Sequence, residues 1–117
     1  MASLKRGDVV LVQFPFTDLT TVKVRPALIV SADPQGIDVT LAFISSVLPL
    51  AEGPFDIVLK PEHKDFGPTG LNRPSVFRMS KLATLESSKI RRRLGEASPA
   101  LLSKLNAKLA HALGLKK

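Results

Sequence analysis

The stretch 24–31 (VRPALIVS) constrains the fold of this chain most, because it joins a short apolar run to a fixed cation. The four consecutive apolar residues 27–30 are too few for a helix and are typical of a strand buried on both faces. Pro26 lacks a backbone N–H and biases Arg25 towards an extended conformation, so the pair predicts a strand entrance. An arginine mounted there holds its guanidinium where a phosphate can bind.

Alternating apolar residues and turn residues predict further short strands along the chain. The expected strands cover residues 7–14, 25–31, 38–46, 56–60, 75–78 and 81–85, with a bend near 79–80 and a long loop over 61–72. Ser98 and Pro99 predict a helix start, and leucines at a spacing of three or four residues follow until Gly114. The pattern indicates a mainly β protein: a small SH3-like barrel with a C-terminal amphipathic helix, as one domain over residues 1–117.

The positive charge is concentrated in one part of the sequence. Residues 1–70 hold six Lys or Arg against eight Asp or Glu, whereas residues 71–93 hold seven against Glu86 alone. A concentrated basic segment is typical of a protein that binds a polyanion such as nucleic acid. The alternative is a solvated surface, which is what a charged run usually means.

The sequence lacks the residue patterns that several kinds of site require. The chain has no cysteine, which excludes disulfide scaffolds, zinc–thiolate sites and thiol nucleophiles. His63 and His111 have no aligned carboxylate or serine pattern, and the carboxylates lack metal-ligand spacing, so we expect neither a metal nor another cofactor. No stretch is long and apolar enough to cross a bilayer, so we expect no membrane association and a cytoplasmic location.

Several segments in a fixed order carry a resemblance to a known family. They are GDVVLV at 7–12, FPFTD at 14–18, RPALIVS at 25–31, FISS at 43–46, Gly70–Leu71 followed by Ser75, and RLG at 93–95 before the closing helix. Together they resemble the MazF/PemK family of toxin endoribonucleases over nearly the whole chain. Where this sequence has FISS, the family has a proline-isoleucine-threonine-serine run.

The resemblance implies a catalytic pair formed by Arg25 and Ser45. RNA carries its own nucleophile, the 2′-OH, so an enzyme needs only to fix the in-line geometry and stabilise negative charge on the phosphoryl oxygens. Arg25 is suited to that charge, whereas acid–base work by an unperturbed guanidinium is a secondary possibility. Ser45 stands where the family has threonine, and it keeps the donor oxygen. Because adjacent strand residues face opposite ways, only one of Ser45 and Ser46 points at Arg25, and we choose Ser45.

Further residues are candidates for binding RNA. Phe16 is a candidate for stacking on a base, with core packing as its alternative, and Thr17 or Asp18 for reading a base edge. The remaining candidates are Ser46, Arg73, Ser75, Arg78 and Lys81. The basic triplet 91–93 reads as part of a loop, where such triplets are often only solvated.

The expected function is therefore a toxin endoribonuclease of a type II toxin–antitoxin system that cleaves single-stranded RNA without a metal. The resemblance also implies a homodimer that is inhibited by a cognate antitoxin protein. Two other functions stay open at this point. The CcdB-type toxins share the barrel but bind gyrase and cut nothing, and a non-catalytic RNA-binding barrel would explain the basic segment equally well.

Overall fold

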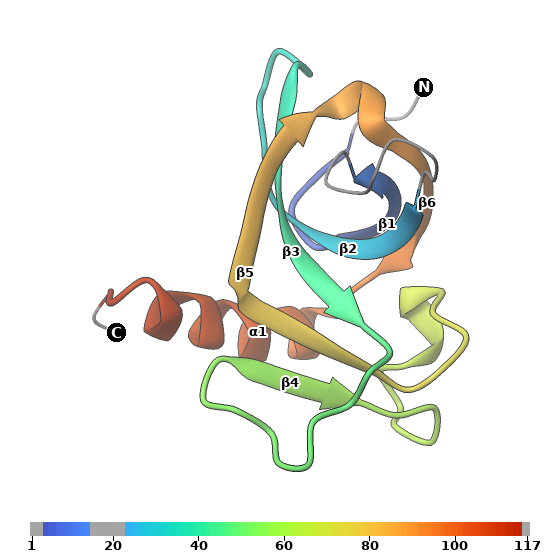
Figure 1. Ribbon diagram of the computed structural model, residues 1–117, viewed down its shortest axis with the longest axis vertical. Helices are drawn as coiled ribbons and strands as arrows, with labels where there is room; N and C mark the ends of the chain where they lie inside the picture. The colour runs from blue at the N-terminus through green and yellow to red at the C-terminus, as the bar shows by residue number, and fades with distance from the viewer. Residues whose placement is uncertain (1–3, 15–22, 116–117) are drawn as a thin grey trace.

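The computed structural model describes residues 4–14 and 23–115, which form six strands and one α-helix (Figure 1). The strands are β1 (Asp8–Phe14), β2 (Lys23–Ala32), β3 (Asp38–Ser45), β4 (Asp56–Leu59), β5 (Ser75–Glu86) and β6 (Ile90–Glu96). Short 3₁₀ turns lie at Gly67–Thr69 (η1) and Ser87–Lys89 (η2), and the helix α1 covers Pro99–Ala112. No helix in the described part of the chain is long and apolar enough to span a membrane.

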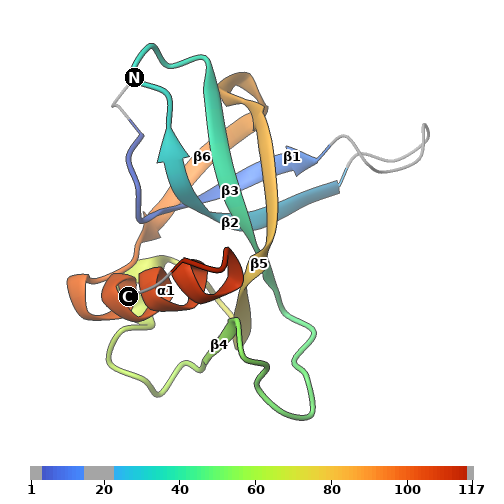
Figure 2. The same ribbon diagram turned by 90° about the vertical axis from the view of Figure 1, so that its left-hand side faces the viewer.

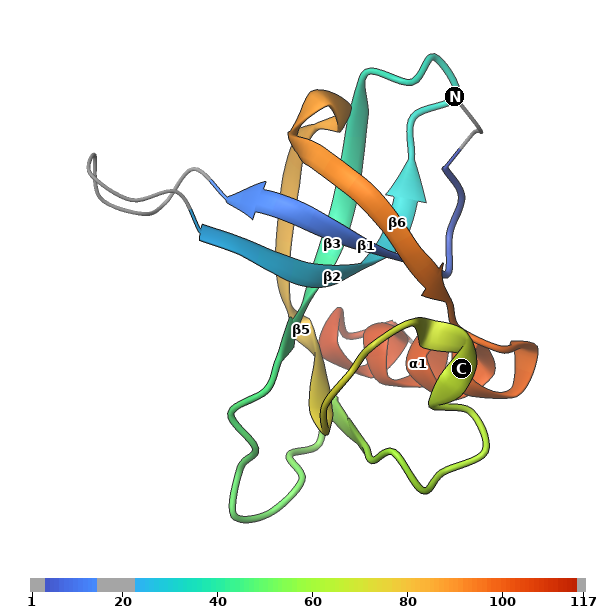
Figure 3. The ribbon, with the colours of Figure 1, turned by 90° about the vertical axis from the view of Figure 1, so that its right-hand side faces the viewer.

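The six strands form one antiparallel sheet in the order β4-β5-β3-β2-β1-β6. β4 and β6 are its two edges, so the sheet is curled but is not closed into a barrel. Figure 3 shows β1, β2 and β6 crossing in front of β3, with the helix below them. The expected class, mainly β with one C-terminal helix, is confirmed, and barrel closure is the part that differs.

The predicted bend near residues 79–80 lies inside one long strand, β5, which the sequence divides into two. Ala42 pairs with Leu82 while Phe43 pairs with Arg78, so residues 79–81 form a bulge opposite β3. A bulge bends a strand and increases its twist without ending the pairing. β5 therefore pairs with β4 below the bulge and with β3 on both sides of the bulge, as Figure 1 shows.

The two faces of the sheet bury different apolar sets. The face covered by α1 holds the helix-side core, in which Leu28, Ala42 and Phe77 pack with helix residues such as Leu105. The opposite, concave face holds the concave-side core, made of Val10, Val12, Phe14, Ala27, Ile29, Val39 and Leu41. Residues 27–29 thus alternate between two cores, as the apolar run predicted. Figure 2 shows the helix against the lower half of the sheet only.

Pro26 lies inside β2 rather than at its entrance, because the strand begins at Lys23. Pro26 pairs with Leu11 on β1, whereas the pairing of β2 with β3 begins only at Ala27. The missing N–H of Pro26 therefore costs no hydrogen bond to β3. The backbone of Arg25 is therefore paired with β1 on one side of the strand and is not paired with β3 on the other side.

The predicted helix is confirmed at both ends. Ser98 is the N-cap: its hydroxyl oxygen accepts from the N–H of Leu101 at 3.1 Å, and Pro99 follows as the first helical residue. The Ser98 hydroxyl donates to the buried carboxylate of Asp65 at 2.9 Å. This bond fixes the start of the helix to the loop 61–72.

The basic triplet 91–93 lies on β6 and not in a loop, which corrects the sequence-based interpretation. β6 is an edge strand that pairs with β1 through two register shifts, so its residues show no regular apolar alternation. The turn η1 packs against its end: a side chain at Gly70 would overlap the carbonyl oxygen of Leu94, and one at Gly95 the carbonyl oxygen of Pro68. Gly70 and Gly95 both belong to the segments that carry the family resemblance. Because neither has a side chain, they permit the close backbone contact between η1 and β6.

We predict that Gly70→Ala destabilises the protein far more than Gly114→Ala. Both glycines have left-handed backbones, with φ of +76° and +75°, and an alanine there costs about 1 kcal/mol. Only at Gly70 does the new methyl group also meet backbone, whereas nothing lies within 4 Å of it at Gly114. Urea unfolding should give a loss above about 3 kcal/mol for Gly70→Ala. Equal losses for the two variants would contradict the close contact between η1 and β6.

Candidate active site

Arg25 and Ser45 come from neighbouring strands at the same end of the sheet. The β2–β3 register pairs Ala27 with Phe43, and continued for two residues it sets Arg25 opposite Ser45, just beyond the last paired residues. Arg25 is exposed and has no ion pair or hydrogen bond within the described residues.

Ser45 is half-buried at the last position of β3. Its hydroxyl oxygen accepts a hydrogen bond from the N–H of Val47 at 3.0 Å. That contact orients the oxygen and leaves its own hydrogen free to be donated. Ser46 follows β3, is exposed, and has no such contact within the described residues. The local geometry thus distinguishes the two serines.

The strand pairing places Arg25, Phe43, Ser45 and Arg78 on one face. Residues directly opposite each other in an antiparallel pair share a face, as do residues two apart on a strand. Arg25 pairs with Val12 and Phe43 pairs with Arg78, and Ser45 is two residues beyond Phe43. Since Val12 and Phe43 belong to the concave side, the whole group lies there. Arg25 and Arg78 thus flank Ser45 from the strands on either side of β3.

Phe43 is a residue of this site that the sequence interpretation did not single out. It is half-buried and packs on Phe14, with ring centroids 4.7 Å apart and planes tilted by 50°. Phe14 itself is a core residue, with 5% of its surface exposed. The one available clue was that an aromatic ring stands here in place of the family's proline.

The other sequence-predicted residues are placed as follows. Arg73 and Lys81 are exposed, and Lys81 lies in the β5 bulge. Ser75 is buried, with 2% exposure, and its hydroxyl donates to the carbonyl of Arg73 at 2.9 Å, so it holds the backbone of Arg73. Phe16, Thr17 and Asp18 lie outside the described residues.

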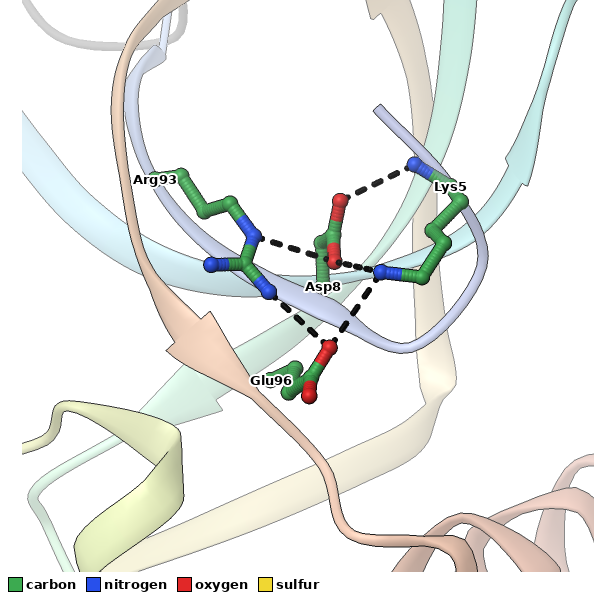
Figure 4. A network of polar contacts seen from close by, with 4 residues as sticks. All are labelled: Lys5, Asp8, Arg93 and Glu96. Atoms are coloured by element: carbon green, nitrogen blue, oxygen red, sulfur yellow. Dashed lines mark hydrogen bonds and ion pairs between the residues drawn. The ribbon is translucent and has the colours of Figure 1, made fainter. Parts of the chain in front are cut away.

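Arg93 belongs to a polar network and is not a free cation (Figure 4). Its Nε lies 3.1 Å from Oδ1 of the buried Asp8, and its Nη2 lies 2.9 Å from Oε1 of Glu96. Lys5 Nζ lies 3.2 Å from the same two oxygens. Hydrogen bonds to Glu96 and to Asp8 raise the pKa of Lys5, so its amine is protonated at neutral pH. This cluster joins β1 to β6.

The two histidines have local partners. His63 Nδ1 accepts from the N–H of Asp65 at 3.0 Å and lies 3.6 Å from Asp65 Oδ2. His111 meets Phe55 edge-on, with ring centroids 5.0 Å apart. Within residues 4–14 and 23–115, no group of three His, Cys, Asp or Glu side chains is arranged to hold a metal ion.

These features define a small, basic, mainly β protein in which the exposed Arg25 and Arg78 flank the Ser45 hydroxyl at one end of a sheet. The family model described as PemK-like, MazF-like toxin of type II toxin–antitoxin system matches residues 5–113, and the chain belongs to this family. RNA cleavage is the activity of the family, so the predicted resemblance and class of enzyme are confirmed. No curated protein sequence matches closely enough to count as a relative.

Solved structures support the fold. An endoribonuclease from a mycobacterial species is 27% identical, with a TM-score of 0.71 over 100% of this chain and 97% of that one. A mycobacterial endoribonuclease in complex with its cognate antitoxin is 24% identical, with a TM-score of 0.73 over 98% and 99%. A MazE–MazF structure from Deinococcus radiodurans is 22% identical, with a TM-score of 0.72 over 97% and 98%. At this identity the last two show the fold alone.

We predict that the network around Asp8 stabilises the protein unequally. Asp8→Asn leaves two cations beside a buried neutral amide and should lower the free energy of unfolding by about 2 kcal/mol or more. Glu96→Gln removes a carboxylate that is 51% exposed and should cost less than about 1 kcal/mol. Urea unfolding at neutral pH measures both. The reverse order would show that Asp8 is not the centre of the network.

Proposed function

We propose that this toxin cleaves single-stranded RNA by attack of the RNA's own 2′-OH on the adjacent phosphorus, without a metal ion. The observation that carries the proposal is the β2–β3 register, which sets an exposed arginine opposite an oriented serine. Such a pair offers positive charge and a hydrogen-bond donor to the same phosphate. Both are required where negative charge develops on the phosphoryl oxygens.

Arg25 is assigned to charge stabilisation. Its planar guanidinium donates to two phosphoryl oxygens at once and stays charged at any working pH. Ser45 is assigned to donate a further hydrogen bond to the same phosphate, with its oxygen already held by the N–H of Val47. The 2′-oxygen gives up its proton to solvent as it adds to phosphorus, the bond from phosphorus to the 5′-oxygen breaks, and the 5′-oxygen takes up a proton from solvent. The products are a 2′,3′-cyclic phosphate and a 5′-OH end.

The surrounding residues are assigned to holding the strand. Arg78 lies across β3 from Arg25, which suits it to a phosphate next to the cleaved one. Arg73 and Lys81 extend the basic surface, while Ser75 fixes the Arg73 backbone from inside. Ser46, at the end of β3, is assigned to a weaker polar contact with RNA. Phe16, Thr17 and Asp18 are retained in the proposal for base recognition on the sequence argument alone.

The same basic surface is proposed to bind the cognate antitoxin. The family is that of type II toxin–antitoxin systems, and one of the similar structures is an endoribonuclease with its antitoxin. An acidic segment of such a partner would use the cations that RNA uses, so the two ligands should compete. We further propose that the toxin acts as a homodimer in the cytoplasm, where its RNA substrate is present.

Incubation with RNA tests the chemistry. We predict that a long single-stranded RNA is cut in the presence of EDTA and that the products end in a 2′,3′-cyclic phosphate. An oligonucleotide with one 2′-deoxy substitution 5′ of the cut should resist cleavage, because it lacks the nucleophile. A requirement for added magnesium, or cleavage of the deoxy oligonucleotide, would refute the mechanism. RNA that is bound but stays intact would favour the non-catalytic binding barrel.

We predict that Arg25→Ala lowers the cleavage rate by about 10³-fold or more, as for other arginines on phosphoryl transition states. Arg25→Lys should also be poor, because a point charge cannot replace the planar fork of donors. Arg92→Ala is the matched control: Arg92 is exposed and pairs with Leu11, which faces away from Val12. Cleavage and circular dichroism should be measured on each variant. A folded Arg25→Ala protein with near-normal activity would overturn the site.

A further inference from the structure

Phe43 lies on the concave face beside the candidate catalytic pair, and the proposed mechanism gives its ring no task. Its neighbours on the adjacent strands are Ala27 of β2 and Arg78 of β5, and Ser45 follows two residues later on the same face. The side chain is half-buried, so part of the ring is exposed at this face. The family has proline at this position, so the ring is a feature of this chain.

The ring of Phe43 reaches across β2 at the level of Arg25. It packs on Phe14 of β1, with ring centroids 4.7 Å apart. Phe14 pairs with Lys23 on β2, whereas Phe43 pairs with Ala27, four positions further along the same strand. The contact between the two rings therefore crosses β2 near Arg25, which lies midway between these positions. The exposed part of the ring is thus next to the proposed phosphate site.

Exposed cations lie around the two rings. Lys23 stands opposite Phe14, and Arg78 stands opposite Phe43. Both share the face of Arg25, because directly opposed residues and residues two apart on a strand lie on one face. Proteins that bind single-stranded RNA combine cations along the phosphates with aromatic rings on which the bases stack. The arrangement here has both parts.

We propose that Phe43 stacks on the base of a nucleotide next to the cleaved phosphate. The inference rests on the proposed function, which supplies the substrate. Phe14 is 5% exposed, so it supports the ring of Phe43 from inside, and the exposed part of Phe43 contacts the base. Every base has an aromatic face, so this contact adds affinity without choosing one base. Because the bases of a duplex are already stacked on each other, it favours single-stranded RNA.

Tryptophan fluorescence tests the stacking directly. The chain has no tryptophan and no tyrosine, so Phe43→Trp introduces one reporter at the proposed position. It is titrated with a single-stranded octamer of 2′-O-methyl RNA, in which the nucleophile is blocked, and with an abasic octamer of the same charge. A stacked base quenches indole fluorescence, so only the octamer with bases should quench. Equal quenching by the two octamers, or none up to about 1 mM, would overturn the proposal.

Phe55→Trp is the matched control for this titration. Phe55 is also half-buried and also meets one ring, that of His111 on α1. It lies outside the proposed RNA site, so neither octamer should quench the fluorescence of this variant. Quenching of equal size in the two variants would show that the octamer binds without preference for Phe43.

Phe43→Leu separates stacking from core packing. Leucine keeps an apolar side chain but has no aromatic face, so the octamer with bases should bind about tenfold more weakly, and the abasic octamer should bind as before. Phe43→Tyr keeps the ring and should bind both octamers like the original chain. Anisotropy of dye-labelled octamers measures binding, and circular dichroism checks the fold. An equal loss for both octamers, or no loss in a folded Phe43→Leu protein, would contradict the proposal.

The stacking test is independent of cleavage, because neither octamer has a free 2′-OH. Quenching that requires the bases, in a protein that leaves unmodified RNA intact, would refute the proposed nuclease and keep the stacking site. Cleavage of unmodified RNA without such quenching would refute the stacking site and keep the nuclease.

Discussion

The antiparallel pairing of β2 with β3 is the constraint on which the rest of the structure depends. It places Leu28 and Ala42 in the helix-side core, and Ile29 and Leu41 in the concave-side core. Leu28, Ile29 and Leu41 each contribute about 1.5–3 kcal/mol by burial, and a slip of one residue would turn all four side chains to the wrong face. The same register sets Arg25 opposite Ser45. The candidate catalytic pair is thus positioned by core packing and needs no direct contact of its own.

Arg25 and the cations of the basic segment 71–93 have different tasks. Arg93 is held by Asp8 and Glu96 and joins the edge strand β6 to β1. Arg25 and Arg78 are exposed on the concave face, on the strands that flank β3. A count of charge along the sequence cannot separate these groups, because the pairing of each cation depends on which carboxylates the fold brings near it. The bulge at residues 79–81 adds to the division by exposing Lys81 while Met79 is buried.

The sequence was sufficient for what depends on local pattern. The apolar run 27–30, the alternation in β3 and the capped helix all follow from periodicity and from residues of special conformation, such as Ser98 and Pro99. The sequence was insufficient where segments distant in the chain determine the local structure. The sequence pattern split β5 in two, because a bulge and a turn look alike without the partner strand. The sequence predicts a loop where β6 lies, because two register shifts break the apolar alternation of this strand. Phe43 was missed, since only strand pairing places it beside Arg78.

The central claim is that Arg25 and Ser45 act on one phosphate because the register brings them together, and a double-mutant cycle on cleavage tests it most directly. Ser45→Ala alone should lower the rate by about 10²–10³-fold, and Ser46→Ala, the control, far less. In the Arg25→Ala background, Ser45→Ala should add little further loss, since groups that stabilise one transition state are not additive. Losses that simply multiply, or a larger effect at Ser46 than at Ser45, would contradict the account.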